Sequence, residues 1–279
     1  MILLDGKKCS QDFKEAIKKE VETFSLKPHL VDIQIGENAA SEVYISGKEK
    51  AAKAVGMDFT CFRFSKDEKE EVIQKKIIEL NNDDTIDGIL IQSPVADNFN
   101  EFQLMNLVTP EKDVDGLTEL NTGKLWTEQE GMVSCTPIGI IELLKYYQIP
   151  IASKHVVIVG RSNLVGKPLI NLFLKENATV SVCHSKTDNL SFYTKQADIL
   201  VVAVGKKHLI TKEMVKEGSV VVDVGINREN GKLYGDVDFD EVSKIVSAIT
   251  PVPGGVGPMT VAMLLNNTLK SYKNKLKKK

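Results

Sequence analysis

The chain of 279 residues has few of the residues that mark metal-binding, disulfide-bonded or membrane proteins. Its four cysteines and four histidines form no CxxC, HxxxH or HExxH spacing, so the sequence does not support a metal site. No apolar run approaches the roughly 20 residues of a membrane-spanning helix. Asp5, Lys7 and Lys8 interrupt the first apolar residues, unlike the start of a signal peptide. We therefore expect a reduced, cytoplasmic protein with no metal and no membrane contact.

An excess of charge of either sign is also absent. The chain has 36 Lys and Arg residues against 38 Asp and Glu residues, which gives a net charge of −2. A nucleic-acid-binding protein normally carries a strongly basic face, so we expect no nucleic-acid partner. The lysines of the last ten residues suit the solvated C-terminal end of a helix, where cations complement the helix dipole.

Short β-branched runs alternate with longer segments of helical period along the chain. This alternation predicts an α/β fold, and the near-continuous Val and Ile runs of the second half suit parallel strands covered by helices on both faces. The expected strands are 29–35, 57–64, 86–92, 155–160, 178–183, 198–204, 219–224 and 246–250. The expected helices are 39–55, 67–82, 137–148 and the segment after 258. Segment 109–136 lacks a clear period, and we place the junction of two domains there.

A glycine-containing turn follows the strand at 155–160 and leads into a predicted helix. Gly160, Arg161, Ser162 and Gly166 lie in this turn, which matches the GxGxxG pattern only imperfectly. At such a turn the free backbone N–H groups of a helix N-terminus can meet a pyrophosphate. The turn therefore indicates a Rossmann-like dinucleotide-binding unit.

The end of the next strand indicates which dinucleotide binds. NAD-binding domains usually place an acidic residue there, where it binds the ribose 2′-hydroxyl. This chain has His184, Ser185 and Lys186 instead, with Arg161 available from the glycine-containing turn. A cationic, hydroxyl-rich corner suits a 2′-phosphate and predicts NADP. The alternative is that Arg161 and His184 make only surface hydrogen bonds.

Candidate substrate-binding residues lie in the first half. Ser41, Tyr44 and Lys48 fall within an arc of about 60° on one face of the helix expected at 39–55. A Tyr and a Lys one turn apart can stack an aromatic substrate and supply an amine, although YxxxK also occurs on many exposed helices. Gln92 ends a predicted strand, and ligands of open α/β sheets bind beyond the carboxyl ends of strands.

Two further loops carry candidate residues but are ambiguous on the pattern alone. Asp113 and Asp115 lie two positions apart in a loop, where such a pair is often only turn chemistry. Gly254, Gly255 and Gly257 form a loop in which backbone can approach a ligand closely, or simply turn from a strand into a helix.

Six motifs occur together and in order: YISGK, PEKDVDG, CTPIG, VGRSNLVGKP, CHSKT and PGGVGPMT. With them the chain resembles the bifunctional methylenetetrahydrofolate dehydrogenase/methenyltetrahydrofolate cyclohydrolase family over nearly its full length. The resemblance implies two α/β domains with a cleft between them, a folate-binding catalytic domain of residues 1–136 and 260–279, and a Rossmann-like NADP-binding domain of residues 137–259. It also implies a homodimer.

The resemblance further implies an oxidoreductase and hydrolase of one-carbon metabolism that serves purine biosynthesis. Such an enzyme oxidises 5,10-methylenetetrahydrofolate with NADP⁺ and hydrolyses the methenyl product to 10-formyltetrahydrofolate. Carried over by motif, Lys48 is the principal catalytic residue, Tyr44 stacks on the folate, Gln92 hydrogen-bonds near Lys48 and Asp115 holds the pterin. Whether Lys48 is the base or orients the water stays open.

The remaining implied contacts divide between the two ligands. The expected NADP contacts are Gly160, Arg161, Ser162, Ser185 and Ile226. The expected further folate contacts are Ser41 and the loop of Pro253, Gly254 and Gly255.

The loop after Gln92 departs from the family pattern Gln-Leu-Pro-Leu-Pro. Ser93 replaces the first leucine and Ala96 replaces the second proline. We expect a less rigid loop and weaker folate binding, which Ser93→Leu combined with Ala96→Pro would reverse.

Two other functions would retain the nucleotide-binding turn. One is a dehydrogenase of the shikimate or amino-acid kind, which has no reason to combine Tyr44, Gln92 and Asp115. The other is a nucleotide-sensing module without turnover, which has no need of Lys48.

Overall fold

The computed structural model describes residues 1–278 and separates into two compact units, which are described in turn. The first unit comprises residues 1–11 and 136–260, and the second comprises residues 12–135 together with the chain from Val261 onward. The expected division placed residues 1–11 with the folate-binding half, whereas their contacts group them with residues 136–260. The physical reason is that β1 (Ile2–Leu3) pairs in parallel with β11 (Ala248–Ile249) of the first unit.

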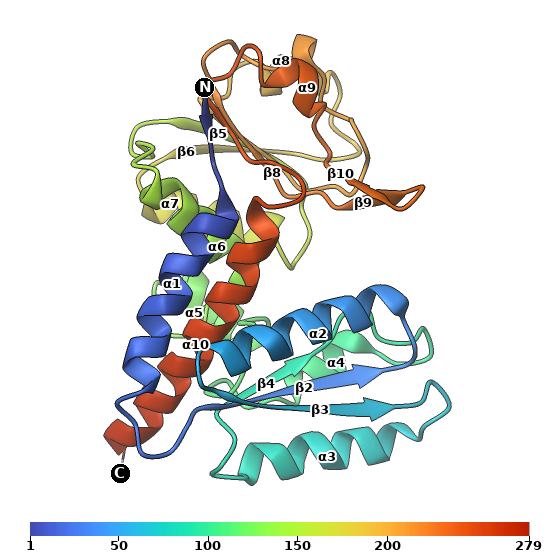
Figure 1. Cartoon of the computed structure of the whole chain (residues 1–279). Helices are drawn as coiled ribbons and strands as arrows, with labels where there is room; N and C mark the ends of the chain where they lie inside the picture. Colours follow the sequence, from blue (N-terminus) through green and yellow to red (C-terminus); the bar gives the residue numbers. More distant parts are fainter. Residues whose placement is uncertain (279) are drawn as a thin grey trace. The chain divides into compact units, whose positions relative to one another are not determined.

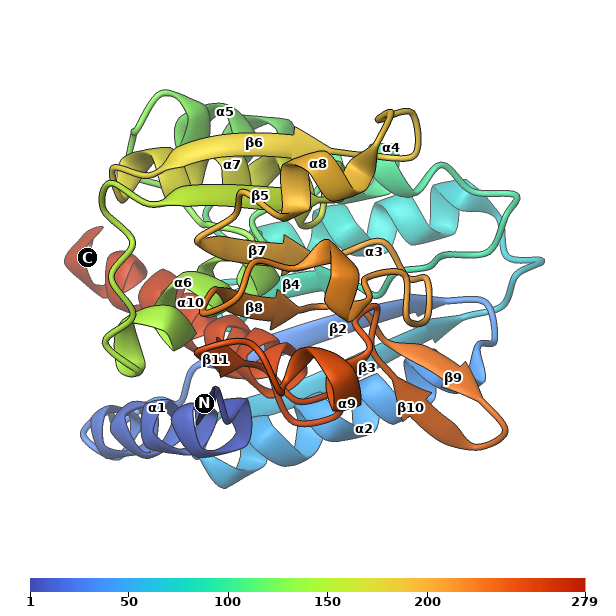
Figure 2. The same cartoon turned by 90° about the horizontal axis from the view of Figure 1, so that it is seen from above.

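The first unit is built on a parallel sheet in the strand order β1-β11-β8-β7-β5-β6. Figure 2 shows β6, β5, β7 and β8 side by side. The central strands are β5 (His155–Val159), β6 (Thr179–Cys183), β7 (Ile199–Val202) and β8 (Val220–Asp223). They lie within or at the predicted ranges, and most of their residues are buried, as continuous Val and Ile runs require.

The order of these strands determines where a ligand binds. From β5 the chain passes through α7 (Gly166–Lys175) to β6 on one side, and then returns through α8 (Leu190–Thr194) to β7 on the other side. The carboxyl ends of β5 and β7 are therefore a topological switch point, the usual ligand position in open α/β sheets. The unit also contains α6 (Cys135–Tyr146), the 3₁₀ helix η1 (Lys212–Met214) and α9 (Phe239–Val242).

A two-stranded hairpin of β9 (Asn227–Glu229) and β10 (Lys232–Tyr234) was not expected from the sequence. Its turn is Asn230-Gly231, and both residues have positive φ (50° and 77°). Asn-Gly is the strongest short hairpin signal, so this element was detectable.

The second unit contains a three-stranded parallel sheet in the order β3-β2-β4. Its strands are β2 (His29–Ile35), β3 (Asp58–Phe64) and β4 (Gly88–Ile91), at or within the expected ranges. Figure 1 shows α2 (Ala39–Ala54) and α3 (Glu70–Asn82) on opposite faces of this sheet. The shorter helices are α4 (Glu101–Asn106) and α5 (Glu119–Trp126).

The helices near the two chain ends, α1 (Gly6–Val21) and α10 (Val256–Lys278), each contribute to both units. Within the second unit, Lys273 of α10 pairs with Glu20 of α1, and the rings of Tyr272 and Phe24 lie 4.9 Å apart. The sequence analysis predicted α10 but neither α1 nor α5. α5 lies inside segment 109–136, where Thr118 caps it by accepting a hydrogen bond from the Asn121 N–H.

The two faces of β2 differ in character, and this difference positions the site. Val31, Ile33 and Ile35 point into an apolar core that includes Ile73 and Ile77 of α3. The alternate residues face the other way and include two buried polar side chains, Asp32 and Gln34. Burying polar groups on the α2 side of the sheet costs free energy unless they are paired. The partners of these groups therefore define the site.

Candidate active site

Lys48 is the centre of the buried polar group on the α2 side of the sheet. Its side chain is 6% exposed, and its Nζ atom forms an ion pair with Asp32, which is fully buried. The same Nζ donates a hydrogen bond to Oε1 of Gln92 at 2.6 Å. The Nε2 of Gln92 donates to the backbone carbonyl of Ser93, which fixes the orientation of the amide. The structure therefore brings the predicted Lys48 and Gln92 together and adds Asp32, which the sequence analysis missed.

The other two predicted residues of α2 lie toward its N-terminus. Ser41 is buried, and its backbone N–H donates to Oδ1 of Asn38 at 3.2 Å. Tyr44 is 45% exposed, so its ring is available to a ligand. One helix thus presents Ser41, Tyr44 and Lys48 within a single arc, as the 3.6-residue period predicts.

The two aspartates of the DVDG segment have separate roles. Asp113 accepts hydrogen bonds from the backbone N–H groups of Leu117 and Thr118, from the Thr118 hydroxyl and from Nδ2 of Asn121. It is the turn-forming residue of the pair. Asp115 takes no part in that network.

Asp115 lies toward the carboxyl end of β4. Asp113 is bridged in parallel to Ile89, and Asp115 lines one small cavity with Ile91, which precedes Gln92 in the chain. Burial, the neighbouring Asp113 charge and a hydrogen bond from Cys135 act on its carboxyl, and the net effect raises its pKa to about 6. Burial and the Asp115 charge raise the pKa of the Cys135 thiol far above its ordinary value, so the thiol stays neutral. Asp115 is thus a half-buried carboxylate facing the Lys48 charge.

The loop after Gln92 is braced in a way that the sequence analysis did not foresee. Glu101 accepts hydrogen bonds from the Ser93 hydroxyl at 2.8 Å and from the backbone N–H of Val95 at 3.1 Å. The N–H of Ala96 donates to the carbonyl of Ile35 at 3.1 Å. Proline has no N–H, so Ala96→Pro would remove this bond and Ser93→Leu would remove another. These losses argue against the expectation that the two changes stiffen the loop, which stays a prediction.

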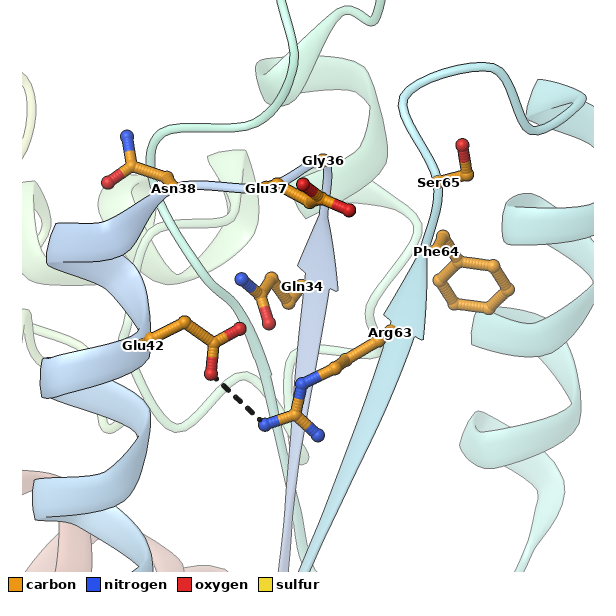
Figure 3. A pocket seen from close by; sticks show the side chains of 8 residues that line it. All are labelled: Gln34, Gly36, Glu37, Asn38, Glu42, Arg63, Phe64 and Ser65. Carbon is orange, nitrogen blue, oxygen red and sulfur yellow. Dashed lines mark hydrogen bonds and ion pairs between the residues drawn. The ribbon is translucent and has the colours of Figure 1, made fainter.

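The polar face of the sheet continues from Asp32 to an open groove of about 730 Å³ at the carboxyl ends of β2 and β3. Figure 3 shows Glu42 of α2 and Arg63 of β3 on either side of Gln34, with a contact of 3.4 Å between carboxylate and guanidinium. Oε1 of Gln34 is buried and accepts no hydrogen bond from residues 1–278. Because β2 and β3 are paired Asp32 to Cys61 and Gln34 to Arg63, these four side chains share one face.

The predicted dinucleotide turn has the close backbone contacts that only glycine allows. Gly160 has φ of 133°, and a Cβ atom there would lie 2.3 Å from the carbonyl oxygen of Ala203 after β7. A Cβ on Gly166 would lie 2.3 Å from the carbonyl oxygen of Gly160. Oγ of Ser162 accepts from the N–H of Val165 at 3.2 Å, at the start of α7. The turn is therefore shaped for a ligand at the helix N-terminus.

Arg161 and Ser185 emerge from neighbouring strand ends. β5 and β6 are paired with Val159 opposite Cys183, and the N–H of Gly160 donates to the Cys183 carbonyl at 2.9 Å. Both Arg161 and Ser185 are exposed, and the segment after β6 offers His184 and Lys186 where NAD-binding domains have a carboxylate. These residues fit a phosphorylated ribose.

Two buried aspartates near the same sheet edge were also missed. Asp236 accepts hydrogen bonds from the backbone N–H groups of Val204, Gly205 and Lys206, and from Nδ2 of Asn227. Asp223 accepts from the N–H groups of Gly225, Asp236 and Val237, and burial raises its pKa to about 6. They fasten the loop after β7 and the segment carrying Ile226, whose side chain is 46% exposed. No sequence spacing marks either residue.

The predicted PGGVG loop approaches α1 of the same unit. Gly254 has φ of 111°, and its carbonyl accepts a hydrogen bond from the N–H of Lys7 at 3.1 Å. A Cβ on Gly6 would lie 1.8 Å from the carbonyl oxygen of Gly255. Pro253 is exposed beside these two glycines, so the loop has both a tightly packed and an accessible side.

Among residues 1–278, no helix is long and apolar enough to cross a membrane, and no three His, Cys, Asp or Glu side chains form a metal-binding group.

The first unit has a doubly wound parallel sheet with a glycine-containing turn, and the second unit buries a lysine beside its sheet. Together these features are typical of a nucleotide-dependent enzyme. Comparison with known proteins identifies which one. Residues 4–115 match the catalytic domain of tetrahydrofolate dehydrogenase/cyclohydrolase, and residues 134–276 match its NAD(P)-binding domain. The chain belongs to the tetrahydrofolate dehydrogenase/cyclohydrolase family.

Individual relatives agree over their full length. The Bifunctional protein FolD of Campylobacter hominis is 49% identical, with 100% of this chain and 99% of the relative covered. The crystal structure of the bifunctional FolD enzyme of Campylobacter jejuni has a TM-score of 0.96 at 46% identity, covering 98% of this chain and 99% of that one. The Trypanosoma brucei FolD structure, complexed with NADP and an inhibitor, has a TM-score of 0.94 at 33% identity, covering 99% and 98%.

Proposed function

We propose that this chain oxidises 5,10-methylenetetrahydrofolate with NADP⁺ and hydrolyses the resulting methenyl form to 10-formyltetrahydrofolate. The observation that carries the proposal is the buried Lys48, held by Asp32 of β2 and by Gln92 at the end of β4, in a unit that matches the family's catalytic domain. The NAD(P)-binding domain match supports the oxidation, because hydride transfer needs a nicotinamide acceptor.

In the second unit, each folate-binding residue has a chemical task suited to its position. Tyr44 is exposed enough to stack on the aromatic part of the folate. Asp115 accepts hydrogen bonds from the amino and ring N–H groups of the pterin. Lys48 and Gln92 act at the methenyl carbon, and the buried Ser41 lines the same helix face.

In the first unit, the residues around the switch point hold the cofactor. NADP supplies the hydride acceptor when bound. Gly160 and Ser162 shape the turn for the pyrophosphate, Arg161 and Ser185 bind the 2′-phosphate, and Ile226 covers an apolar part of the cofactor. Pro253, Gly254 and Gly255 contact the folate through their backbone.

The biological setting follows from the same reaction. We propose a cytoplasmic homodimer whose product, 10-formyltetrahydrofolate, serves purine biosynthesis. The family resemblance supports these assignments. Size-exclusion chromatography coupled to light scattering tests the dimer directly, because a monomer mass would contradict it.

The function is tested by following NADPH formation from methylenetetrahydrofolate and NADP⁺, with NAD⁺ as the comparison. A second assay follows the loss of methenyltetrahydrofolate in the absence of nucleotide. We expect both activities and a preference for NADP⁺. Absence of turnover in both assays would instead support a nucleotide-binding module.

A further inference from the structure

Asp32 is a fully buried carboxylate whose position needs a reason beyond folding. It lies in the middle of β2, between Val31 and Ile33, which belong to the apolar core. Apart from the ion pair with Lys48, neither of its oxygens has a hydrogen-bond partner among residues 1–278. A buried ion pair with so little hydrogen bonding contributes little net stability, because desolvation offsets the attraction. The carboxylate therefore points to a functional role.

The acceptors around Lys48 fit an ammonium group, whose charge is favoured by the ion pair with Asp32. An ammonium group has three hydrogens and no acceptor site. Asp32 takes one of these hydrogens, and Gln92 Oε1 takes a second at 2.6 Å. The Gln92 amide cannot turn its nitrogen toward Lys48 without losing its own bond to the Ser93 carbonyl. Two acceptors therefore face Lys48, and one hydrogen remains for a ligand.

We propose that Asp32 is a positioning residue that keeps Lys48 as an ammonium with one N–H free, so that Lys48 donates a hydrogen bond to the oxygen added to the methenyl carbon. The inference rests on the proposed hydrolase function and decides between the two roles left open for Lys48. Hydrolysis forms one carbon–oxygen bond and breaks one carbon–nitrogen bond. One proton of the water goes to the freed nitrogen, and the other goes to solvent.

The other ionisable groups that act on Asp32 and Lys48 titrate outside the window from about pH 7 to about pH 9.5. Arg63 of β3 is a permanent cation, and Glu42 of α2 is ion-paired to it. Burial and the Asp32 charge raise the pKa of Cys61 to about 11, so its thiol is neutral. Asp115, with a pKa of about 6, is ionised above neutral pH. These groups therefore keep their charge between about pH 7 and about pH 9.5.

Asp32→Asn is the informative variant, because the amide removes the charge and keeps one acceptor oxygen for Lys48. A matched control is Asp87→Asn. Asp87 is a second buried aspartate of the same unit, and it is ion-paired to Lys275 of α10. It lies at the opposite end of β4 from Gln92, so its loss affects stability without touching Lys48.

The experiment measures kcat for methenyltetrahydrofolate hydrolysis against pH, with the uncatalysed rate subtracted. We expect the wild type and Asp87→Asn to keep a constant kcat between about pH 7 and about pH 9.5. In Asp32→Asn the ammonium loses its stabilising anion, so we expect the decline in kcat to begin at lower pH than in the wild type. The variant's kcat should therefore fall at least about threefold within this window, while NADP⁺ binding is unchanged.

Three outcomes would contradict parts of this account. An Asp32→Asn profile that superimposes on the wild type overturns the role of Asp32 alone. A wild-type kcat that rises about tenfold per pH unit shows that the neutral amine is the working form, and decides the question even if Asp32→Asn does not fold. A wild type with no hydrolysis refutes the proposed function itself.

Discussion

Glu101 holds Ser93 through a hydrogen bond of 2.8 Å from the Ser93 hydroxyl to its Oε1 atom. Its other oxygen accepts from the backbone N–H of Val95. One carboxylate thus ties both ends of a turn that follows directly on Gln92, the partner of Lys48. The brace holds the loop that lacks the second proline of the family pattern, and it gives this loop a different source of rigidity.

Removing the brace should weaken folate binding. In Glu101→Ala the Ser93 hydroxyl and the Val95 N–H both lose their acceptor, so the loop has more conformations to lose when folate binds. We expect the folate KM to rise about three- to tenfold and the NADP⁺ KM to stay constant. Ser93→Ala, which removes only one of the two bonds, should give a smaller rise. Equal steady-state constants for Glu101→Ala and the wild type would show that the loop needs no brace.

Arg161→Ala should separate the two nicotinamide cofactors. A charge-assisted hydrogen bond to phosphate contributes about 1.5–3 kcal/mol, which corresponds to a roughly ten- to hundredfold loss of NADP⁺ affinity. NAD⁺ has no 2′-phosphate, so its affinity should change little. Titration of both nucleotides measures the difference, and an equal loss for both would exclude phosphate recognition by Arg161.

Asp115→Asn should impair the use of folate while leaving NADP⁺ binding intact. The ionised carboxylate accepts two donors from the pterin, whereas an amide offers one acceptor oxygen. We expect a raised folate KM in both activities. Unchanged folate kinetics would reduce Asp115 to a structural residue.

The same substitution should stabilise the fold, with a defined pH dependence. Burial raises the Asp115 pKa from 3.8 to about 6, so the native state holds its proton more tightly than the unfolded state. Ionisation therefore costs stability as the pH rises from about 4 to about 6, and the full cost is present above that range. We expect Asp115→Asn to raise the free energy of unfolding at pH 7 by roughly 1–3 kcal/mol and to have little effect near pH 4. Urea unfolding at both pH values measures this, and a destabilised variant at pH 7 would contradict it.

Asp236→Ala should destabilise the first unit and weaken NADP⁺ binding together. It leaves three backbone N–H groups and the Asn227 amide without their acceptor, at a cost of roughly 2–5 kcal/mol. Thermal unfolding and nucleotide titration measure the two effects, with Asp240→Ala of the exposed α9 surface as the control. A variant with wild-type affinity for NADP⁺ would show that the loop after β7 does not need this anchor.

All strands of the two parallel sheets except β1 were predicted, and β5, β7 and β8 were the clearest because buried parallel strands consist of continuous apolar runs. β2 illustrates the limit of that rule, since its range was predicted correctly while Asp32 was not recognised as a partner of Lys48. The two residues are 16 positions apart on different elements, and only the packing of α2 on β2 brings them together.

Loops were harder to interpret than strands, because their hydrogen bonds join residues far apart in the chain. Asp113 and Asp115 have identical side chains, yet only Asp113 forms the turn. The acceptor role of Asp236 depends on donors about 30 positions away. The role of Glu101 likewise required the position of α4 relative to the loop.

The central claim is that one chain performs both reactions and that Lys48 is required for the second. Its most direct test is to measure NADPH formation and methenyltetrahydrofolate hydrolysis on the same preparations of the wild type and Lys48→Met. We predict that the wild type has both activities and that the variant loses hydrolysis by about 100-fold or more, while still binding folate and NADP⁺. Wild-type hydrolysis by Lys48→Met would contradict the account.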